Sequence, residues 1–158
     1  MHAGPVYVAS LVARLHSGSA GAQEQPRSQE LAAKELSRLM IKSADNQAVI
    51  ARAAATEPLV ALVRSGSAGA QEQAAIALGH LADGNAANQE TIAQAGAIEP
   101  FVARVRGGSA GAQVRAAAAL SSLAFDNADN QEAIARAGAI EPLVALVRGG
   151  SAKAQEAA

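Results

Sequence analysis

Apolar residues recur along this chain at three- and four-residue steps, the spacing of one face of an α-helix. The clearest case is the segment 67–82, in which one face would carry Ala70, Ala74, Leu78 and Leu81. The sequence therefore predicts a helix here, and the same pattern elsewhere predicts an all-α protein.

The pattern repeats at a fixed interval. Three prolines follow one another at intervals of 42 residues, at Pro58, Pro100 and Pro142. Three asparagines have the same spacing, at Asn46, Asn88 and Asn130. A period of this size is typical of arrays in which each unit buries its apolar face only by stacking on its neighbours.

Each unit reads as three helices, and the last copy shows the first two clearly. The segment 130–137, "NQEAIARA", predicts a short helix with Asn130 or Asp129 as its N-cap. Gly138 would end this helix, and Pro142 would lie in the first turn of the next one, where its missing N–H costs nothing.

A glycine–serine motif precedes the third helix of each unit. Its serine is placed to cap that helix, and the predicted caps are Ser19, Ser67, Ser109 and Ser151. The first copy of the motif, "SGSAGAQEQ" at 17–25, lies 48 residues before the second, at 65–73. We place the six extra residues in or beside 25–30, as part of either a lengthened third helix or a loop.

These motifs resemble the armadillo repeat. The resemblance rests on "NQEAIARAGAIEPLVALVRGGSAKAQEAA" and the "AAAALSSLA" before it, and it covers residues 10–158. It implies a right-handed α-solenoid of three-helix repeats, with HEAT repeats as the nearest alternative. We expect a single domain, 1–158, with repeats at about 1–45, 46–87, 88–129 and 130–158, the last incomplete.

Composition narrows the function classes. Half of the 158 residues are hydrophobic, mostly alanine, with one Tyr, two Phe and no Trp, which favours closely packed helices. A net charge of −1 gives no overall attraction to nucleic acid or anionic membrane. We see no leader sequence and no run of about 18 apolar residues for a membrane span.

The sequence lacks recognisable catalytic chemistry. The glycine-rich motif is not followed by the Lys and Ser/Thr of a phosphate-binding loop. His2, His16 and His80 are scattered, and there is no cysteine. Asp126 and Asp129 read as helix-capping acids. We therefore expect neither an enzyme nor a bound cofactor or metal.

The resemblance implies that the third helices line a concave groove, where the importin-alpha and beta-catenin families bind extended peptides. The importin-like pattern needs a tryptophan and an asparagine on each third helix. Its asparagine positions here are Arg38, His80 and Ser122, and its tryptophan positions are Lys34, Ile76 and Ala118. None matches, so we do not expect recognition of nuclear-localisation peptides.

The groove face of the third helices defines the candidate site. Its members are Arg27, Lys34, Arg38, Gln73, Ile76, His80, Arg115, Ala118, Ser122 and Lys153. Five of them are cations, and arginine binds carboxylate or phosphate in a bidentate way. We predict a groove for an acidic or phosphorylated peptide segment. The alternative is a solvated surface whose charge is offset by Glu30, Glu35, Glu72 and Glu156.

The chain stops before the fourth unit reaches counterparts of Leu120 and Leu123. A bare end of an array exposes core surface, so we expect either a piece of a longer array or self-association into a dimer or filament. The prediction is thus a non-enzymatic scaffold, with a self-associating module or an engineered consensus array as the alternative. The resemblance implies an intracellular location, in the cytoplasm or nucleus.

Overall fold

The structure, a computed structural model, describes residues 3–16 and 25–149. These residues form ten α-helices, and no strand occurs among them. The helices are α1 (Pro5–His16), α2 (Gln25–Lys42), α3 (Ala44–Arg52), α4 (Thr56–Ser65), α5 (Ala68–Ala82), α6 (Ala86–Gln94), α7 (Ile98–Gly107), α8 (Ala110–Ala124), α9 (Ala128–Arg136) and α10 (Ile140–Gly149).

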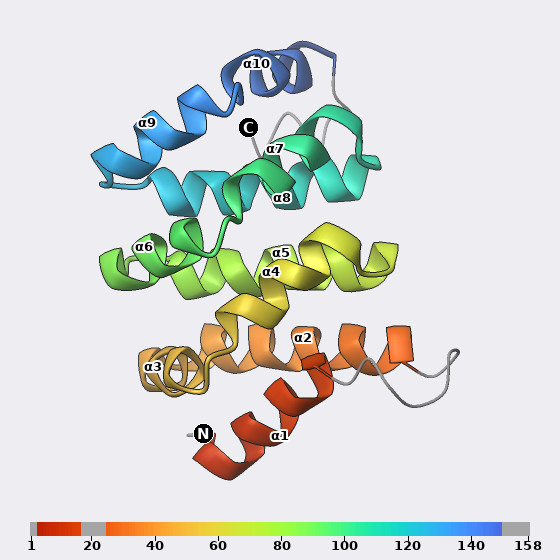
Figure 1. Cartoon of the computed structure of the whole chain (residues 1–158), viewed down its shortest axis with the longest axis vertical. Helices are drawn as coiled ribbons and strands as arrows, with labels where there is room; N and C mark the ends of the chain where they lie inside the picture. Colours follow the sequence, from red (N-terminus) through yellow and green to blue (C-terminus); the bar gives the residue numbers. More distant parts are fainter. Residues whose placement is uncertain (1–2, 17–24, 150–158) are drawn as a thin grey trace.

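The third helices α2, α5 and α8 form the layers of a stack along the long axis of the molecule (Figure 1). The helix α5 packs between the other two. The short helices α3, α6 and α9 lie together at one edge of the stack, and α1, α4, α7 and α10 run across it (Figure 1). The molecule is a right-handed α-solenoid built from short, second and third helices in turn, as the resemblance to the armadillo repeat implies.

The predicted apolar face of α5 is the core of the stack. Ala70, Ala74, Leu78 and Leu81 are all buried there. Alanine on the contact surfaces lets neighbouring helices pack closely, and leucine and Phe101 fill the space between layers. The periodicity prediction is confirmed.

The hinge between the first and second helices also forms as predicted. Gly96 and Gly138 adopt φ angles of 76° and 75°, a left-handed conformation that glycine enters without steric cost. Pro142 lies in the first turn of α10. In the earliest copy, "AATEP", Ala54 occupies the hinge with a φ of 56°.

The predicted cap of the short helix is wrong by two or three residues. The helix α9 begins at Ala128, and Asn127 is its N-cap, accepting a bond from the Asn130 N–H at 3.0 Å. Asp129 lies in the first turn. Asn130 is buried, and its Nδ2 donates to the carbonyl of Leu123 instead.

The serine caps of the third helices are confirmed where the structure describes them. The hydroxyl oxygens of Ser67 and Ser109 accept bonds from the N–H groups of Ala70 and Ala112, each at 3.2 Å. Ser19 and Ser151 lie outside the described residues.

The sequence predicts the six extra residues of the first copy in or beside 25–30. Two residues connect α4 to α5, whereas residues 17–24, which precede α2 in the chain, lie outside the described residues. The segment 25–30 opens α2, with Pro26 in its first turn. The helix α2 is longer than α5, 18 residues against 15, but most of the added length is at its C-terminal end.

No helix in residues 3–16 or 25–149 is long and apolar enough to cross a membrane.

Candidate binding groove

The stacking of the third helices is fixed by the asparagine and glutamine of the recurring "NQ" motif. The Nδ2 of Asn88 donates to the Leu81 carbonyl at 2.8 Å, which satisfies the end of α5. The next residue, Gln89, donates to the carbonyls of Ser122 and Phe125 at the end of α8, at 3.0 and 3.1 Å. The motif therefore joins the ends of two successive third helices, a role that sequence periodicity alone did not reveal.

The first copy of the motif makes the same connection. Gln47 on α3 donates from Nε2 to the carbonyl of His80 at 2.6 Å. Because the end of α5 is held in this way, the side chain of His80 is presented from a fixed backbone.

Arginines of the second helices tie consecutive units together on another edge. Arg64 donates to the Gly96 carbonyl at 2.9 Å, and Arg106 donates to the Gly138 carbonyl at 3.1 Å. Each bond runs from the end of one second helix to the hinge of the next unit. These two cations serve the scaffold, and they are not part of the predicted groove face.

The predicted site residues lie on all three third helices. Arg27, Lys34 and Arg38 on α2 are exposed, as are Arg115 and Ala118 on α8. Gln73, Ile76 and His80 on α5 and Ser122 on α8 are half-buried. Lys153 lies outside the described residues. That these side chains bind a peptide stays a prediction.

A cavity of about 130 Å³ opens between α5 and α8, and five of the predicted residues line it. The full lining is Ala75, Ile76, Gly79, His80, Arg115, Ala118, Ala119 and Ser122. A Cβ at Gly79 would lie 3.6 Å from the Cα of Ala119, an ordinary van der Waals contact, so α5 and α8 approach closely at this point. The lining combines small residues, such as Ala75 and Ala119, with the polar residues His80, Arg115 and Ser122.

Burial lowers the pKa of His80 below its ordinary value of 6.5, and the positive charge of Arg115 lowers it further. The carboxylate of Asp83 acts in the opposite direction, but its effect is smaller than that of burial. His80 is therefore mostly neutral at pH 7.

Of the three described acids that could offset the positive charge of the predicted site, only one forms an ion pair with a cation of that site. Glu35 pairs with Arg38 at 3.0 Å, an exposed pair of the kind that contributes little. The carboxylates of Glu30 and Glu72 instead lie against Gly69 and Gly111, in the first turns of α5 and α8, where a negative charge is favoured.

Three further cations of the site form no ion pair among the described residues, namely Arg27, Lys34 and Arg115. Glu156 lies outside the described residues.

Metal ligation has no support in the part of the chain that the structure describes. No group of three or more His, Cys, Asp or Glu side chains is placed there to hold an ion.

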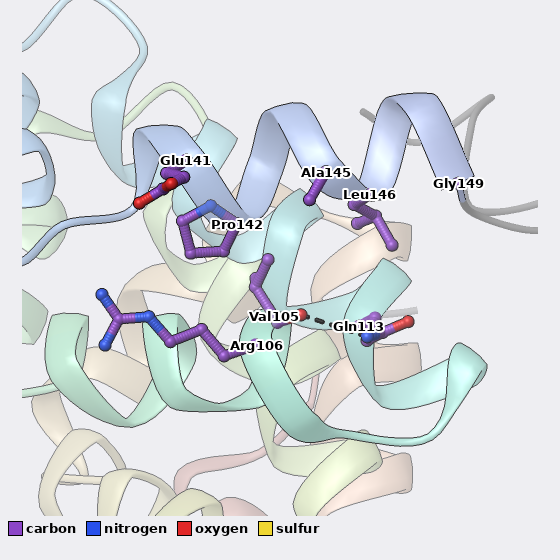
Figure 2. Close-up of a pocket in the computed structure, with 8 residues that line it drawn as sticks. All are labelled: Val105, Arg106, Gln113, Glu141, Pro142, Ala145, Leu146 and Gly149. Atoms are coloured by element: carbon purple, nitrogen blue, oxygen red, sulfur yellow. Dashed lines mark hydrogen bonds between the residues drawn. The ribbon is translucent and has the colours of Figure 1, made fainter.

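A second cavity, which the sequence analysis missed, lies on the second helices (Figure 2). It measures about 380 Å³ and is lined by Val105, Arg106, Gln113, Glu141, Pro142, Ala145, Leu146 and Gly149. Inside it, Gln113 donates to the Val105 carbonyl at 3.1 Å (Figure 2).

Related cavities lie one and two units earlier, against Pro100 and Pro58. The 42-residue spacing of the prolines is the signal that could have located all three. The recurrence follows from how the second helices pack, so it identifies no ligand by itself.

Comparison with solved structures settles the fold. An engineered protein from the Northeast Structural Genomics Consortium matches with a TM-score of 0.85 and 29% identity, over 95% of this chain and 58% of its own. A computationally designed armadillo repeat protein for modular peptide recognition matches with a TM-score of 0.82 and 25% identity, over 95% of this chain and 60% of its own. The chain is an armadillo-like repeat protein.

A third solved structure is a designed armadillo repeat protein in complex with the peptide (KR)4. It has a TM-score of 0.85 and 23% identity, over 96% of this chain and 61% of its own. This armadillo-like chain thus spans about three fifths of the length of these proteins. No protein-family model and no curated protein sequence matches it.

Proposed function

We propose that this chain is a non-enzymatic scaffold whose third helices form a concave groove that binds an extended, acidic peptide segment. The observation that carries the proposal is the set of cations on the groove face, of which Arg27, Lys34 and Arg115 have no acidic partner among the described residues. Arginines held on rigid helices can bind carboxylates with two parallel hydrogen bonds.

The designed relative bound to (KR)4 supports a peptide as the class of ligand. Its basic peptide does not carry over, because cations of this chain would repel lysine and arginine side chains. We include in the proposal the single domain 1–158 with its four repeats, and an intracellular location inferred from the resemblance.

Binding of capped hexaglutamate and capped hexalysine, each measured by fluorescence anisotropy, tests this function. We expect hexaglutamate to bind and hexalysine not to, with affinity falling between about 20 mM and about 500 mM salt because screening weakens exposed charge pairs. Equal weak binding of both peptides would contradict the proposal.

A charge-reversed pair of variants locates the site. Arg38→Glu with Arg115→Glu should abolish hexaglutamate binding. The matched control is Arg52→Glu with Arg136→Glu, which makes the same change in net charge at the exposed ends of α3 and α9. If both pairs weaken binding equally, the attraction is a property of net charge, and the groove is not the site.

A second candidate function, self-association, is supported by an apolar stripe on α10. Ile140, Val144 and Val147 are 62%, 42% and 46% exposed, although they lie at the helical spacing of a buried face. We propose that a second copy covers this stripe. Sedimentation velocity across a concentration series should show a dimer that Val144→Lys removes, and a concentration-independent monomer would refute it.

A further inference from the structure

The cavity between α5 and α8 is suited to one side chain. At about 130 Å³, it holds roughly four waters, taking about 30 Å³ for each. A carboxylate on a short stem fits this space, whereas a second helix or an extended backbone does not. The cavity therefore selects a single residue of a bound segment.

The chemistry around the cavity favours an anion. Arg115 offers a guanidinium, Ser122 offers a hydroxyl, and His80 offers a ring nitrogen. The apolar part of the lining, Ile76 and Ala118, can contact the methylene stem of a glutamate. Among the described residues, no carboxylate lines the cavity.

The charge state of His80 depends on what the cavity holds. Its charged neighbours are Asp83 at the end of α5 and Arg115 on α8. On the opposite side of α5, α2 carries Arg38 at the corresponding repeat position. The element α3 presents the uncharged Gln47, and no charged group of α4 or α6 acts on His80 among the described residues.

We propose that this cavity binds one carboxylate side chain of an acidic segment, and that His80 takes up a proton as the carboxylate enters, so that binding tightens as the pH falls. The proposal rests on the proposed acidic-peptide function and adds the anchoring position and its pH control.

The direction of the effect follows from linkage. Burial and Arg115 keep the His80 pKa below 6.5, so the ring is mostly neutral at pH 7. A carboxylate in contact with the ring favours its charged form and raises its pKa. A ligand that raises the pKa binds better when protons are more abundant, by up to about tenfold for each pH unit.

Capped hexaglutamate is a suitable probe, because glutamate carboxylates with an ordinary pKa of about 4.3 stay ionised above about pH 6. Isothermal titration calorimetry should show its affinity for the wild-type chain rising by roughly threefold to tenfold from about pH 7.5 to about pH 6.0. In NMR titrations, the peptide should raise the pKa of the His80 ring.

Two histidine variants separate this role from a general effect of pH. His80→Gln should lose the increase in hexaglutamate affinity between about pH 7.5 and about pH 6.0, because glutamine takes up no proton in this range. His16→Gln, on α1 away from the groove face, should keep it.

The two proposals fail in different ways. Binding that is independent of pH, with a His80 pKa that the peptide leaves unmoved, overturns the anchoring role and leaves the acidic-peptide function standing. Absence of hexaglutamate binding at either pH overturns both. The NMR readout uses the wild-type chain, so it decides the question even where a variant folds poorly.

Discussion

The helices α7 and α10 have nearly the same sequence in two different settings. "IEPFVARVRG" and "IEPLVALVRG" differ at two positions. Yet Val102 and Val105 of α7 are each 2% exposed, whereas their counterparts Val144 and Val147 are 42% and 46% exposed. The helix α8 packs on α7, and no third helix follows α10 within the described residues. The same two valine positions thus lie in the core of one unit and on an open surface of another.

Polar residues show the same contrast. Gln89 is 2% exposed and bonds to two carbonyls at the end of the next third helix. Its counterpart Gln131 is exposed and turns back to the Ala124 carbonyl of the preceding helix. The role of each side chain is set by the neighbouring unit.

The largest expected difference in stability between α7 and α10 comes from truncating a large apolar side chain at the same position of each helix. Phe101→Ala should lower the free energy of unfolding by about 3–5 kcal/mol, because Phe101 is fully buried and its removal leaves a cavity. Leu143→Ala, at the corresponding position of α10, should cost clearly less because Leu143 is only partly buried. Urea denaturation measures both, and equal losses would show that α10 is as well covered as α7.

Alanine substitutions of Gln89 and Gln131 test whether the buried glutamine stabilises the fold more than the exposed one. Gln89→Ala should cost roughly 1–3 kcal/mol, since it leaves carbonyls at the end of α8 without their donor in a mostly buried site. Gln131→Ala should change stability by less than about 0.5 kcal/mol, as is usual for an exposed side chain. Thermal and urea unfolding of the two variants should therefore diverge. A small effect at Gln89 would mean that water replaces the lost bonds.

Substitutions at the hinges should change stability by a smaller amount, and the change should be a loss at Gly96 but a gain at Ala54. Gly96→Ala should destabilise the chain by about 1–2 kcal/mol because the left-handed conformation crowds a Cβ. That Cβ would also lie 2.5 Å from the Arg64 guanidinium. Ala54→Gly should stabilise by up to about 1 kcal/mol by relieving the same strain. Loss of stability in Ala54→Gly would contradict this account.

The smallest expected effect is the contribution of His80 to the pH dependence of stability. Because the folded-state pKa of His80 lies below 6.5, the unfolded chain takes up this proton first as the pH falls. The free energy of unfolding should therefore decline between pH 6.5 and the lowered pKa, with no contribution above that window. His80→Gln should flatten this part of the curve relative to the wild type, and His16→Gln should leave the His80 contribution intact.

Sequence reasoning was most successful where the cause is local. The serine caps, the glycine hinges and the first-turn prolines depend on backbone geometry within a few residues, and the structure confirms them at Ser67, Gly138 and Pro142. The prediction of Asn130 as an N-cap was wrong. Asparagine is a suitable residue type for a cap, but the side chain of Asn130 donates to the Leu123 carbonyl instead. The spacing of Asn127 three residues earlier is the signal that would have identified the cap.

The sequence by itself determined the helices, their order and the 42-residue period, because propensity, capping and apolar spacing act along the chain. Only the tertiary structure decided which apolar stripes are covered, which side chains of the third helices surround a cavity, and how burial shifts the pKa of His80. Those properties depend on groups from neighbouring units about 40 residues away, and stacking alone brings such groups into contact.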